Sequence, residues 1–383
     1  MSRVHGSDVL IVGGGMVGTA TAFFLTQRGQ RVTLFEQQLV GQQASGTNFG
    51  NVRRQGRPLF ELPMANRASA IWRRMPELVG SDVEYLQRGH LRICYRDRPD
   101  YLERFATYAA EAAPLGLSLE ILEGAALRSR FPFFGPEVLA GSWSAEDGHA
   151  NPRLAAPAFA RAAARGGATI LEQVEVLAAV HDGAQFEVNL AEGSRWRAPA
   201  LLIAAGAWSA PLAAAFGEPV ALVTRAPTMS VTEPVPYAIE PSIGVSTPVE
   251  QESVYFRQIP RGNVIIGGST RGPSWTDARR APVVPENTLS QLRQIRRLVP
   301  GFGVLQLIRV WSGVESYTPD DTPVIGASAR VPGLFYGFGF SGSGFQLSPG
   351  AGQTLAELIA TGSTPIDLRP YSIQRFATPV KER

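Results

Sequence analysis

Three glycines and one glutamate near the N-terminus have the residue types and spacing that suit binding of a dinucleotide. In the turn 13–18, Gly13 lets the chain turn sharply out of an apolar strand, Gly15 lets backbone N–H groups approach a diphosphate, and Gly18 lets the next helix pack closely. Glu36 closes the next apolar run, where its carboxylate accepts both hydroxyl groups of an adenosine ribose and repels a 2′-phosphate. The alternative is a turn in which glycine only saves space. The strand before the turn, the helix after it and the acidic residue favour a dinucleotide site.

Composition and charge argue against several classes of protein. The chain of 383 residues, 44% of them apolar, is long enough for two domains with full-sized cores. Its net charge of +3 comes with scattered arginines rather than basic runs, which does not support nucleic-acid binding. Cys94 is the only cysteine, which excludes an internal disulfide and any cysteine-rich metal or iron–sulfur site, and we assign no residue to a metal. Lys381 is the only lysine, which argues against a Schiff-base mechanism.

The pattern of apolar segments bears on localisation. No apolar stretch reaches the length of a bilayer span, and residues 1–8 contain no signal-like apolar core. We therefore expect a cytoplasmic protein without a transmembrane segment.

The order of predicted elements indicates that one domain is inserted into another. After the first strand–helix–strand unit, the polar segment 41–57 is long for a connection, which favours a functional role. Apolar periodicity then predicts helices at 59–79, 101–113 and 154–165, strands at 89–94 and 168–171, and a hairpin at 185–197 before a buried parallel strand at 200–206. Residues 219–311 read as antiparallel strands with one helix at 288–298. The α/β pattern returns at 333 and closes with a helix at 350–359.

Further motifs give the chain a family resemblance over essentially its whole length. They are Asp147-Gly148 with Asn151-Pro152, and the segments 204–209, 318–323 and 339–345. Together with the glycine turn they resemble the flavoproteins built like D-amino-acid oxidase, a group that includes glycine oxidase, sarcosine oxidases and several amino-acid dehydrogenases. Within this group, the segments 44–57 and 311–317 look most like the β subunits of opine, D-hydroxyproline and sarcosine-type dehydrogenases.

The resemblance implies an α/β fold with two domains. The first is a three-layer, Rossmann-like FAD-binding domain assembled from residues 1–78, 143–216 and 317–369. The second is an inserted α+β substrate-binding domain with a mainly antiparallel sheet, formed by residues 79–142 and 217–316. Residues 370–383 form a C-terminal tail.

The resemblance also implies FAD rather than NAD, with the flavin between the two domains. The loop 337–344 precedes the last helix, so its N–H groups and the positive helix end suit the pyrimidine edge of the flavin. The alternative for this loop is a tight turn beside the first strand. Thr47 and Asn48 are expected at the centre of the cofactor and the Val174 backbone at the adenine, whereas Trp208 is either a cofactor contact or a core residue. The residues that we expect to contact FAD are Gly13, Gly15, Met16, Val17, Gly18, Glu36, Gln37, Ser45, Thr47, Asn48, Val174, Ala205, Gly206, Trp208, Gly313, Gly339, Ser341, Gly342, Ser343, Gly344, Phe345 and Gln346.

The single cysteine bears on how FAD is attached. Sarcosine oxidases that bind FAD covalently use a cysteine shortly before their Thr-Pro-Asp motif, and residues 313–318 contain none. Cys94 lies in a different predicted strand and suits an apolar filler. We therefore expect non-covalent FAD.

Oxidation of an amine by flavin needs orientation more than acid–base catalysis, because the neutral amine delivers hydride from its α-carbon to flavin N5. We therefore assign no catalytic role to His149 or the other histidines. An amino-acid substrate needs its carboxylate held, which suits arginine. We expect this role for Arg54 or Arg53, and for Arg257 together with Tyr255, which share a strand face by alternation. The alternative for each is a solvated charge or an ion pair between the domains.

Two positions depart from the family pattern. Glycine oxidase-like members have an arginine where this chain has Glu315, which predicts a substrate with a second cationic group or an amine docked on Glu315; the alternative is a structural carboxylate paired with Arg309 or another arginine. Sarcosine oxidases have His and Lys at the positions of Ser343 and Gln346, and they use a lysine above the flavin to help oxygen accept electrons. With Lys381 as the only lysine, we expect a dehydrogenase that passes electrons to a partner.

These observations predict an FAD-dependent dehydrogenase that oxidises the C–N bond of a secondary or cyclic amino acid such as D-hydroxyproline, an opine or sarcosine. The resemblance implies that it is the flavin β subunit of a hetero-oligomer that includes a second flavoprotein and an iron–sulfur protein. One alternative is a free-standing amino-acid oxidase of the glycine or sarcosine type that produces hydrogen peroxide. Another is a FAD-binding structural subunit without turnover.

Overall fold

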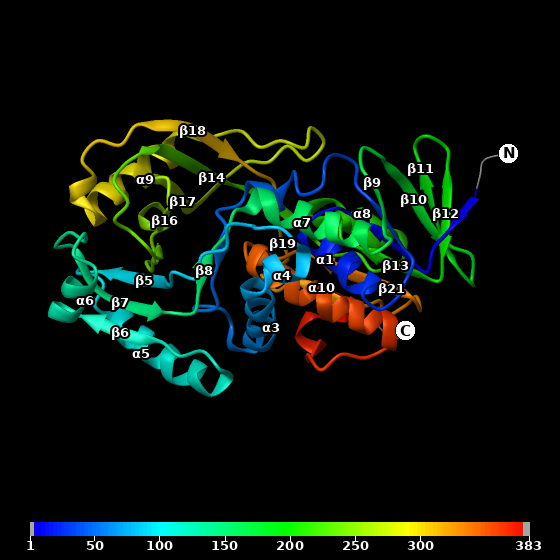
Figure 1. Ribbon diagram of the computed structural model, residues 1–383, viewed down its shortest axis with the longest axis horizontal. Coiled ribbons are helices and arrows are strands. Elements are labelled where there is room, and N and C mark those ends of the chain that lie inside the picture. The colour runs from blue at the N-terminus through cyan, green and yellow to red at the C-terminus, as the bar shows by residue number, and fades with distance from the viewer. Residues whose placement is uncertain (1–3, 378–383) are drawn as a thin grey trace, which may run out of the picture.

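The computed structural model describes residues 4–377, and it is built around two large sheets at opposite ends of an elongated molecule (Figure 1). Lys381 and the end of the predicted C-terminal tail lie outside the described residues. No helix within 4–377 combines the length and apolar character needed to cross a bilayer.

The six-stranded sheet forms the middle layer of the dinucleotide-binding half. Its order is β20-β21-β13-β2-β3-β9, and all neighbours are parallel except β20 and β21. The two strands on either side of the predicted turn, β2 and β3, are fully buried, as expected for a parallel sheet covered on both faces. The strand bounds are β2 Val9–Val12, β3 Val32–Phe35, β9 Thr169–Leu171, β13 Ala200–Ile203, β20 Val324–Ala327 and β21 Leu334–Phe338.

Helices cover one face of this sheet and a small second sheet covers the other. The helical layer consists of α1 (Met16–Thr26), α3 (Leu62–Arg73), α7 (Pro152–Arg165) and α10 (Gly344–Thr361), which share one apolar core. The opposite layer is the sheet β1-β12-β11-β10, with β1 Val4–Gly6, β10 Val176–His181, β11 Phe186–Leu190 and β12 Arg195–Ala198. The predicted hairpin is the antiparallel pair β11–β12, and the predicted three-layer α/β fold is confirmed.

The nine-stranded sheet forms the second half and joins two distant parts of the chain. Its order is β18-β14-β17-β16-β15-β5-β7-β6, with β19 paired to β14. Every neighbouring pair is antiparallel except β15 and β5, where the two chain segments meet. The bounds are β5 His90–Tyr95, β6 Glu120–Glu123, β7 Val138–Ser144, β14 Val223–Pro234, β15 Ser242–Val245, β16 Val254–Gln258, β17 Asn263–Gly272, β18 Leu307–Ser312 and β19 Glu315–Tyr317. The division of the chain into two domains at the stated boundaries stays a prediction, and β7 crosses the boundary placed at 142.

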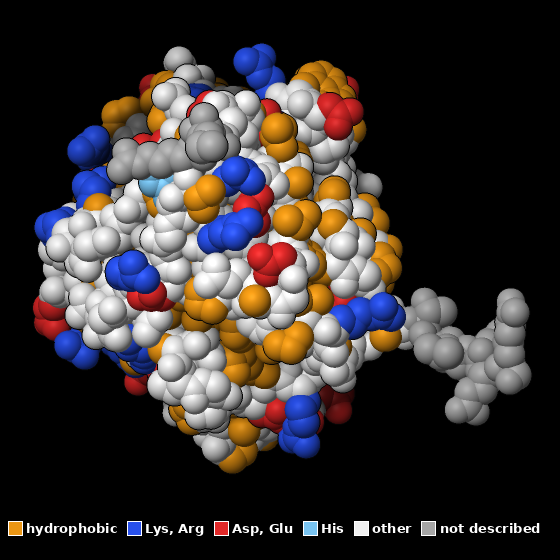
Figure 2. Space-filling view, turned by 90° about the vertical axis from the view of Figure 1, so that its right-hand side faces the viewer, with side chains coloured by type: hydrophobic (Ala, Val, Ile, Leu, Met, Phe, Trp, Pro, Cys, Tyr) orange, Lys and Arg blue, Asp and Glu red, His pale blue; other side chains and the backbone are white. Residues whose placement is uncertain are grey.

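The remaining elements surround these sheets. They are α2 (Ala44–Thr47), α4 (Met75–Val79), α5 (Asp100–Ala112), α6 (Gly124–Arg130), α8 (Ser209–Ala215), α9 (Pro285–Leu298), β4 (Asn51–Val52) and β8 (Gly148–His149). On the face shown in Figure 2, basic and acidic side chains are interspersed, and no continuous basic surface forms in its described part.

The last helix differs from its prediction in a way that matters for the site. It begins at Gly344, six residues before the predicted start, and includes Pro349. The glycines are needed inside the helix because α3 and α1 approach it closely. A Cβ on Gly350 would lie 2.9 Å from the Met64 carbonyl oxygen, and one on Gly352 would lie 2.6 Å from Cβ of Ala20. Close packing on α3 and α1 thus outweighs the low helix propensity of glycine and proline. As a result, the N-terminus of α10 directly follows the glycine-rich loop.

Candidate cofactor and substrate cavity

An elongated cavity of about 700 Å³ lies between the two halves, at the carboxyl ends of β2, β3, β13 and β21. One end is lined by the glycine turn, Glu36 and Trp208, and the other by Tyr255, Glu315 and a group of arginines. This is the crevice in which open α/β sheets bind ligands.

The glycine turn depends on close contacts that no larger residue permits. Gly13 has φ +114°, and a Cβ on it would lie 2.3 Å from the carbonyl oxygen of Ala204. A Cβ on Gly18 would lie 2.0 Å from the carbonyl oxygen of Gly13, so Gly18 packs beneath the turn and does not line the cavity. Gly15, in contrast, lines it.

The Glu36 carboxylate is held in place at the cavity by two backbone donors. Gly14 N donates to Oε2 at 2.7 Å, and Gln38 N donates to Oε1 at 2.8 Å. Each carboxylate oxygen keeps acceptor capacity beyond these bonds. The arrangement therefore leaves an anchored acceptor beside the N-terminus of α1.

The segment after α1 supplies a further wall of the cavity. Ser45 lines it, and its Oγ accepts a hydrogen bond from Met16 N at 2.9 Å. Asn48 also lines it, with its side-chain amide bonded to the carbonyl oxygens of α2. Thr47 and Gly313 lie outside the lining: a Cβ on Gly313 would be 1.9 Å from Thr47 Oγ1, and Trp311 Nε1 donates to the Thr47 carbonyl at 2.8 Å. This pair joins the segment to the nine-stranded sheet.

Most of the other residues expected at the cofactor line the cavity. The loop before α10 contains left-handed backbone at Gly339, Ser341 and Gly342, which brings it against the cavity. The Gln346 side chain donates to the Ala65 carbonyl at 2.8 Å, and its buried Oε1 has no partner among residues 4–377. The expected residues that line the cavity are Gly13, Gly15, Met16, Val17, Glu36, Gln37, Ser45, Asn48, Val174, Ala205, Gly206, Trp208, Gly339, Ser341, Gly342, Ser343, Gly344, Phe345 and Gln346.

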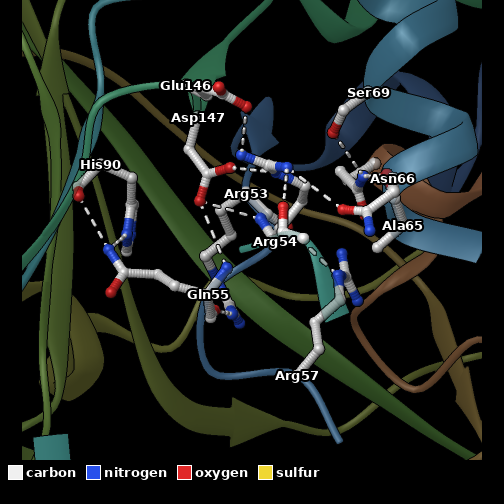
Figure 3. A network of polar contacts seen from close by, with 12 residues as sticks. Arg53, Arg54, Gln55, Arg57, Ala65, Asn66, Ser69, His90, Glu146 and Asp147 are labelled. Atoms are coloured by element: carbon white, nitrogen blue, oxygen red, sulfur yellow. Dashed lines mark hydrogen bonds and ion pairs between the residues drawn. The ribbon is translucent and has the colours of Figure 1, made fainter. Parts of the chain in front are cut away.

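The two neighbouring arginines of the segment 41–57 point to different surroundings (Figure 3). Arg54 is 3% exposed and lies outside the cavity lining; its Nε pairs with Asp147 at 3.1 Å and its Nη2 with Glu146 at 2.8 Å. Arg53 lines the cavity, donates to the Gln55 carbonyl, and forms no ion pair with any described carboxylate. Of the two candidates for holding a substrate carboxylate, only Arg53 therefore lies at the cavity, whereas Arg54 forms buried ion pairs with Asp147 and Glu146.

Arg92 is a second arginine of this kind, and its place at the cavity was not predicted from the sequence. It lines the cavity from β5, its Nε donates to Ser246 Oγ at 3.1 Å, and it too lacks a carboxylate partner in the described part of the chain. Burial, together with the charge of Arg53, lowers the Arg92 pKa to about 10, and burial lowers the pKa of Arg53 as well. Because an arginine side chain does not lose its proton in proteins, both guanidinium groups are cationic at neutral pH. A charged residue inside an otherwise apolar predicted strand was the signal available in the sequence.

Tyr255 and Arg257 share a strand, but only Tyr255 lines the main cavity. The Arg257 guanidinium donates to the carbonyl oxygens of Phe49 (2.9 Å) and Ala150 (3.3 Å) and contacts His149 Nδ1 at 3.0 Å. It lines a separate cavity of about 200 Å³. The expected contact of Arg257 with substrate is therefore not supported, because its donors are used to attach the segment 41–57 to the sheet.

Glu315 lines the cavity on β19 and has a partner other than the one first considered. Tyr317 O–H donates to its Oε2 at 2.7 Å, and Arg271 Nε donates to the Tyr317 hydroxyl at 2.8 Å. Arg309 lies over the Trp311 ring instead. Burial and the neighbouring Glu315 charge raise the pKa of Tyr317, and burial raises the pKa of Tyr255 to about 12, so both phenols stay protonated.

His90 and Cys94 do not provide reactive groups here. Burial lowers the His90 pKa well below its usual value, which leaves a neutral ring bonded to Gln55. Cys94 is buried in β5, away from the cavity lining. Within the described residues, no group of three or more His, Cys, Asp or Glu side chains is arranged to hold a metal ion.

Comparisons with known proteins agree with this arrangement. A family model described as "DAO: FAD dependent oxidoreductase" matches residues 8–358. A glycine oxidase from Geobacillus kaustophilus is 30% identical over 97% of each chain, and one of the subunits of opine oxidase from Agrobacterium tumefaciens is 26% identical over 96% of this chain and 97% of its own. The crystal structure of L-proline dehydrogenase from P. horikoshii superposes with a TM-score of 0.89 at 25% identity, covering 98% of each chain.

The anchored Glu36 carboxylate gives a first prediction. We expect Glu36→Gln to raise the Kd for FAD about tenfold or more, because a hydrogen bond to a charged acceptor contributes about 1.5–3 kcal/mol. Titration of the apoprotein with FAD, followed by flavin fluorescence, measures the change. Glu192→Gln is the control, since Glu192 is exposed and lies outside the cavity lining. Equal affinities of Glu36→Gln and the unmodified protein would contradict the assignment.

Proposed function

The chain belongs to the DAO family of FAD-dependent oxidoreductases, and we propose that it oxidises the C–N bond of a small amino acid with a secondary or cyclic amine. The observation that carries this proposal is the pair of arginines, Arg53 and Arg92, that line the cavity without a carboxylate partner among residues 4–377. Two desolvated guanidinium groups beside a cofactor cavity suit a substrate carboxylate. Two of the named relatives support the secondary or cyclic amine, since their names give opines and L-proline as substrates, whereas glycine oxidase supports only the broader class of small amino acids.

The described residues fit FAD over the length of the cavity. We propose that Glu36 accepts the ribose hydroxyls, that the N-terminus of α1 faces the diphosphate, and that the loop 339–346 with the start of α10 holds the flavin. The close contact at Gly13 and the small residue at Gly15 leave room for a diphosphate against the backbone. FAD binds without a covalent bond in this proposal, because the buried Cys94 does not reach the cavity.

FAD, when bound, supplies the acceptor for a hydride from the substrate α-carbon. The protein's own residues orient the substrate and set its protonation state. Arg53 and Arg92 bind the carboxylate and so fix the α-carbon relative to the loop 339–346. Their positive charges disfavour an ammonium group nearby and so favour the neutral amine that reacts, whereas Arg57 is paired with Glu61 at 3.4 Å.

Glu315 is the acidic group on the β19 side of this cavity. We propose that it recognises a second cationic group of the substrate or the amine itself, with Tyr317 orienting its carboxylate. The link through Tyr317 to Arg271 supports this role, because Glu315 has no direct ion pair with an arginine in the described residues.

We further propose that the electrons leave through a partner chain. One relative is named as part of a multi-subunit opine oxidase, and no lysine occurs among residues 4–377 to assist oxygen at the flavin. A second candidate is a free-standing amino-acid oxidase, which the 30% identity to glycine oxidase over 97% of both chains favours.

Anaerobic reduction of the bound flavin separates these functions. We expect sarcosine, proline or an opine to bleach the flavin absorbance at least about tenfold faster than glycine, with slow recovery in air and fast recovery with an electron-accepting dye. Stopped-flow spectroscopy gives both rates. Rapid bleaching by glycine with rapid recovery in air would favour the free-standing oxidase. Flavin that stays oxidised with every amino acid would contradict both functions and would indicate a FAD-binding subunit without turnover.

A substitution at Arg53 tests the carboxylate site. Arg53→Gln should raise KM about 30- to 150-fold, because a charge-assisted hydrogen bond contributes about 2–3 kcal/mol, with FAD affinity unchanged. The KM of Arg53→Lys should lie between that of Arg53→Gln and that of the unmodified protein, since lysine keeps the charge but loses the planar fork. Arg88→Gln, an exposed arginine outside the cavity lining, is the control. An unchanged KM for Arg53→Gln would remove Arg53 from the substrate site.

A substitution at Glu315 tests the second polar contact. We expect Glu315→Gln to lower kcat/KM about tenfold for the preferred substrate and to change it little for amino acids that lack the group it recognises. Steady-state kinetics over the amino-acid panel, with FAD content checked by absorbance, measures this. Glu240→Gln, on the exposed surface, serves as reference. Kinetics identical to the unmodified protein for the preferred substrate would assign Glu315 a structural role.

A further inference from the structure

A loop from the nine-stranded half crosses to the dinucleotide end of the main cavity. We call residues 273–284, which connect β17 to α9, the crossing loop. It extends from these elements toward the middle of the molecule, in yellow (Figure 1). Two backbone hydrogen bonds between Trp275 and Arg280, of 2.8 and 3.1 Å, close its turn.

The tip of the crossing loop contacts two segments of the six-stranded half, the connection between β3 and α2 and the turn before α8. The Arg279 guanidinium donates to Gln37 Oε1 and lies 4.9 Å from the centre of the Trp208 ring. The Arg279 carbonyl accepts from Gln43 Nε2 at 3.3 Å, and the Thr276 carbonyl accepts from Trp208 Nε1 at 3.2 Å. Arg279, Gln37, Gln43 and Trp208 all line the cavity. The loop therefore bridges the two walls of the crevice at the end marked by Glu36.

Arg279 also differs in charge from its surroundings. The other lining arginines lie toward the far end: Arg53, Arg57 and Arg92 group together, and Arg271 contacts Tyr317. At the dinucleotide end the lining includes the carboxylates of Glu36 and Glu175. Arg279 makes no ion pair with a carboxylate of the described chain, and its contact with Gln37 uses one of five N–H donors. It thus brings a positive charge without an ion-pair partner among residues 4–377 to the end of the cavity where the ADP part of a dinucleotide would lie.

The backbone of Arg279 has a conformation that is unusual for a residue other than glycine. Its φ of +53° lies in the left-handed region, which a non-glycine side chain adopts at an energetic cost. Glycine would remove that cost but also the guanidinium. Hydrogen bonds within the loop, including one from Arg279 N to the Thr276 carbonyl at 3.1 Å, hold the residue in this conformation, and the contacts with Gln37 and Trp208 hold its guanidinium at the cavity.

We propose that the crossing loop is a latch over bound FAD and that Arg279 binds the ADP half of the cofactor through its charge. The proposal rests on the FAD orientation given under the proposed function. In this arrangement the half of the molecule that binds substrate also controls cofactor release, because FAD leaves only when the contacts to Gln37, Gln43 and Trp208 open.

Paired substitutions in the loop test this proposal. In holoprotein with Arg279→Gln, FAD should dissociate about 10- to 100-fold faster after dilution, measured by the rise in free-flavin fluorescence, and the Kd for FAD should rise by a similar factor. KM for the amino acid at saturating FAD should not change. Arg280→Gln removes the same charge from a neighbour in the same loop that lies outside the cavity lining, and it should leave FAD release unchanged.

Salt dependence provides a second measurement that does not rely on turnover. FAD affinity of the unmodified protein should fall more steeply with ionic strength than that of Arg279→Gln, because the variant has lost a charge contact. Equal FAD release from Arg279→Gln and the unmodified protein would overturn the latch, as would an equal increase in Arg280→Gln. These results are distinguishable from failure of the proposed function, in which the unmodified protein either binds no FAD or holds FAD that no amino acid reduces.

Discussion

The contact between the glycine turn and the end of β13 is the constraint on which the rest of the structure depends. Gly13 approaches the Ala204 carbonyl so closely that any side chain there would displace one of the two central strands. Gly18 packs on Gly13 from below, which aligns α1 with the crevice, and the N-cap residue Gly15 adds no side chain at the helix N-terminus, where Ser45 Oγ accepts from Met16 N. Everything that lines the cavity is positioned relative to this turn, including the Glu36 carboxylate that accepts from Gly14 N.

Buried arginines attach the segment 41–57 to both halves and so shape the opposite wall. Arg54 is fixed by Asp147 and Glu146, and Arg257 reaches from β16 to the carbonyl oxygens of Phe49 and Ala150. Breaking a buried pair by removing one partner leaves an uncompensated charge, which is strongly destabilising. These arginines therefore keep a long polar segment in one conformation, while Arg53 and Arg92 remain available to a substrate carboxylate at this end of the cavity.

Local patterns were sufficient to predict the dinucleotide crevice, since the glycine turn, Glu36 and the buried strands lie close together in sequence. The antiparallel character of 219–311 was predicted from its strand pattern, whereas the three-layer arrangement was implied by the family resemblance. The choice between Arg53 and Arg54 could not be made locally, because it depends on Asp147, far along the chain. Strand alternation placed Tyr255 and Arg257 on one face correctly. It could not predict that the long Arg257 side chain extends to the Phe49 carbonyl instead of the main cavity. The early start of α10 could not be predicted, because the glycine and proline residues in its first turns normally disfavour a helix and are explained only by close packing on α3 and α1. Arg279 was missed because no pattern marks a loop that crosses between halves.

A crystal structure of the FAD complex with an unreactive carboxylate analogue of the substrate would test the central claim most directly. We predict extended FAD with its ribose hydroxyls on Glu36 and its flavin against the loop 339–346. We also predict that the carboxylate of the analogue lies between Arg53 and Arg92. Cofactor density that leaves Glu36 without a contact, or a carboxylate bound elsewhere in the cavity, would contradict this claim.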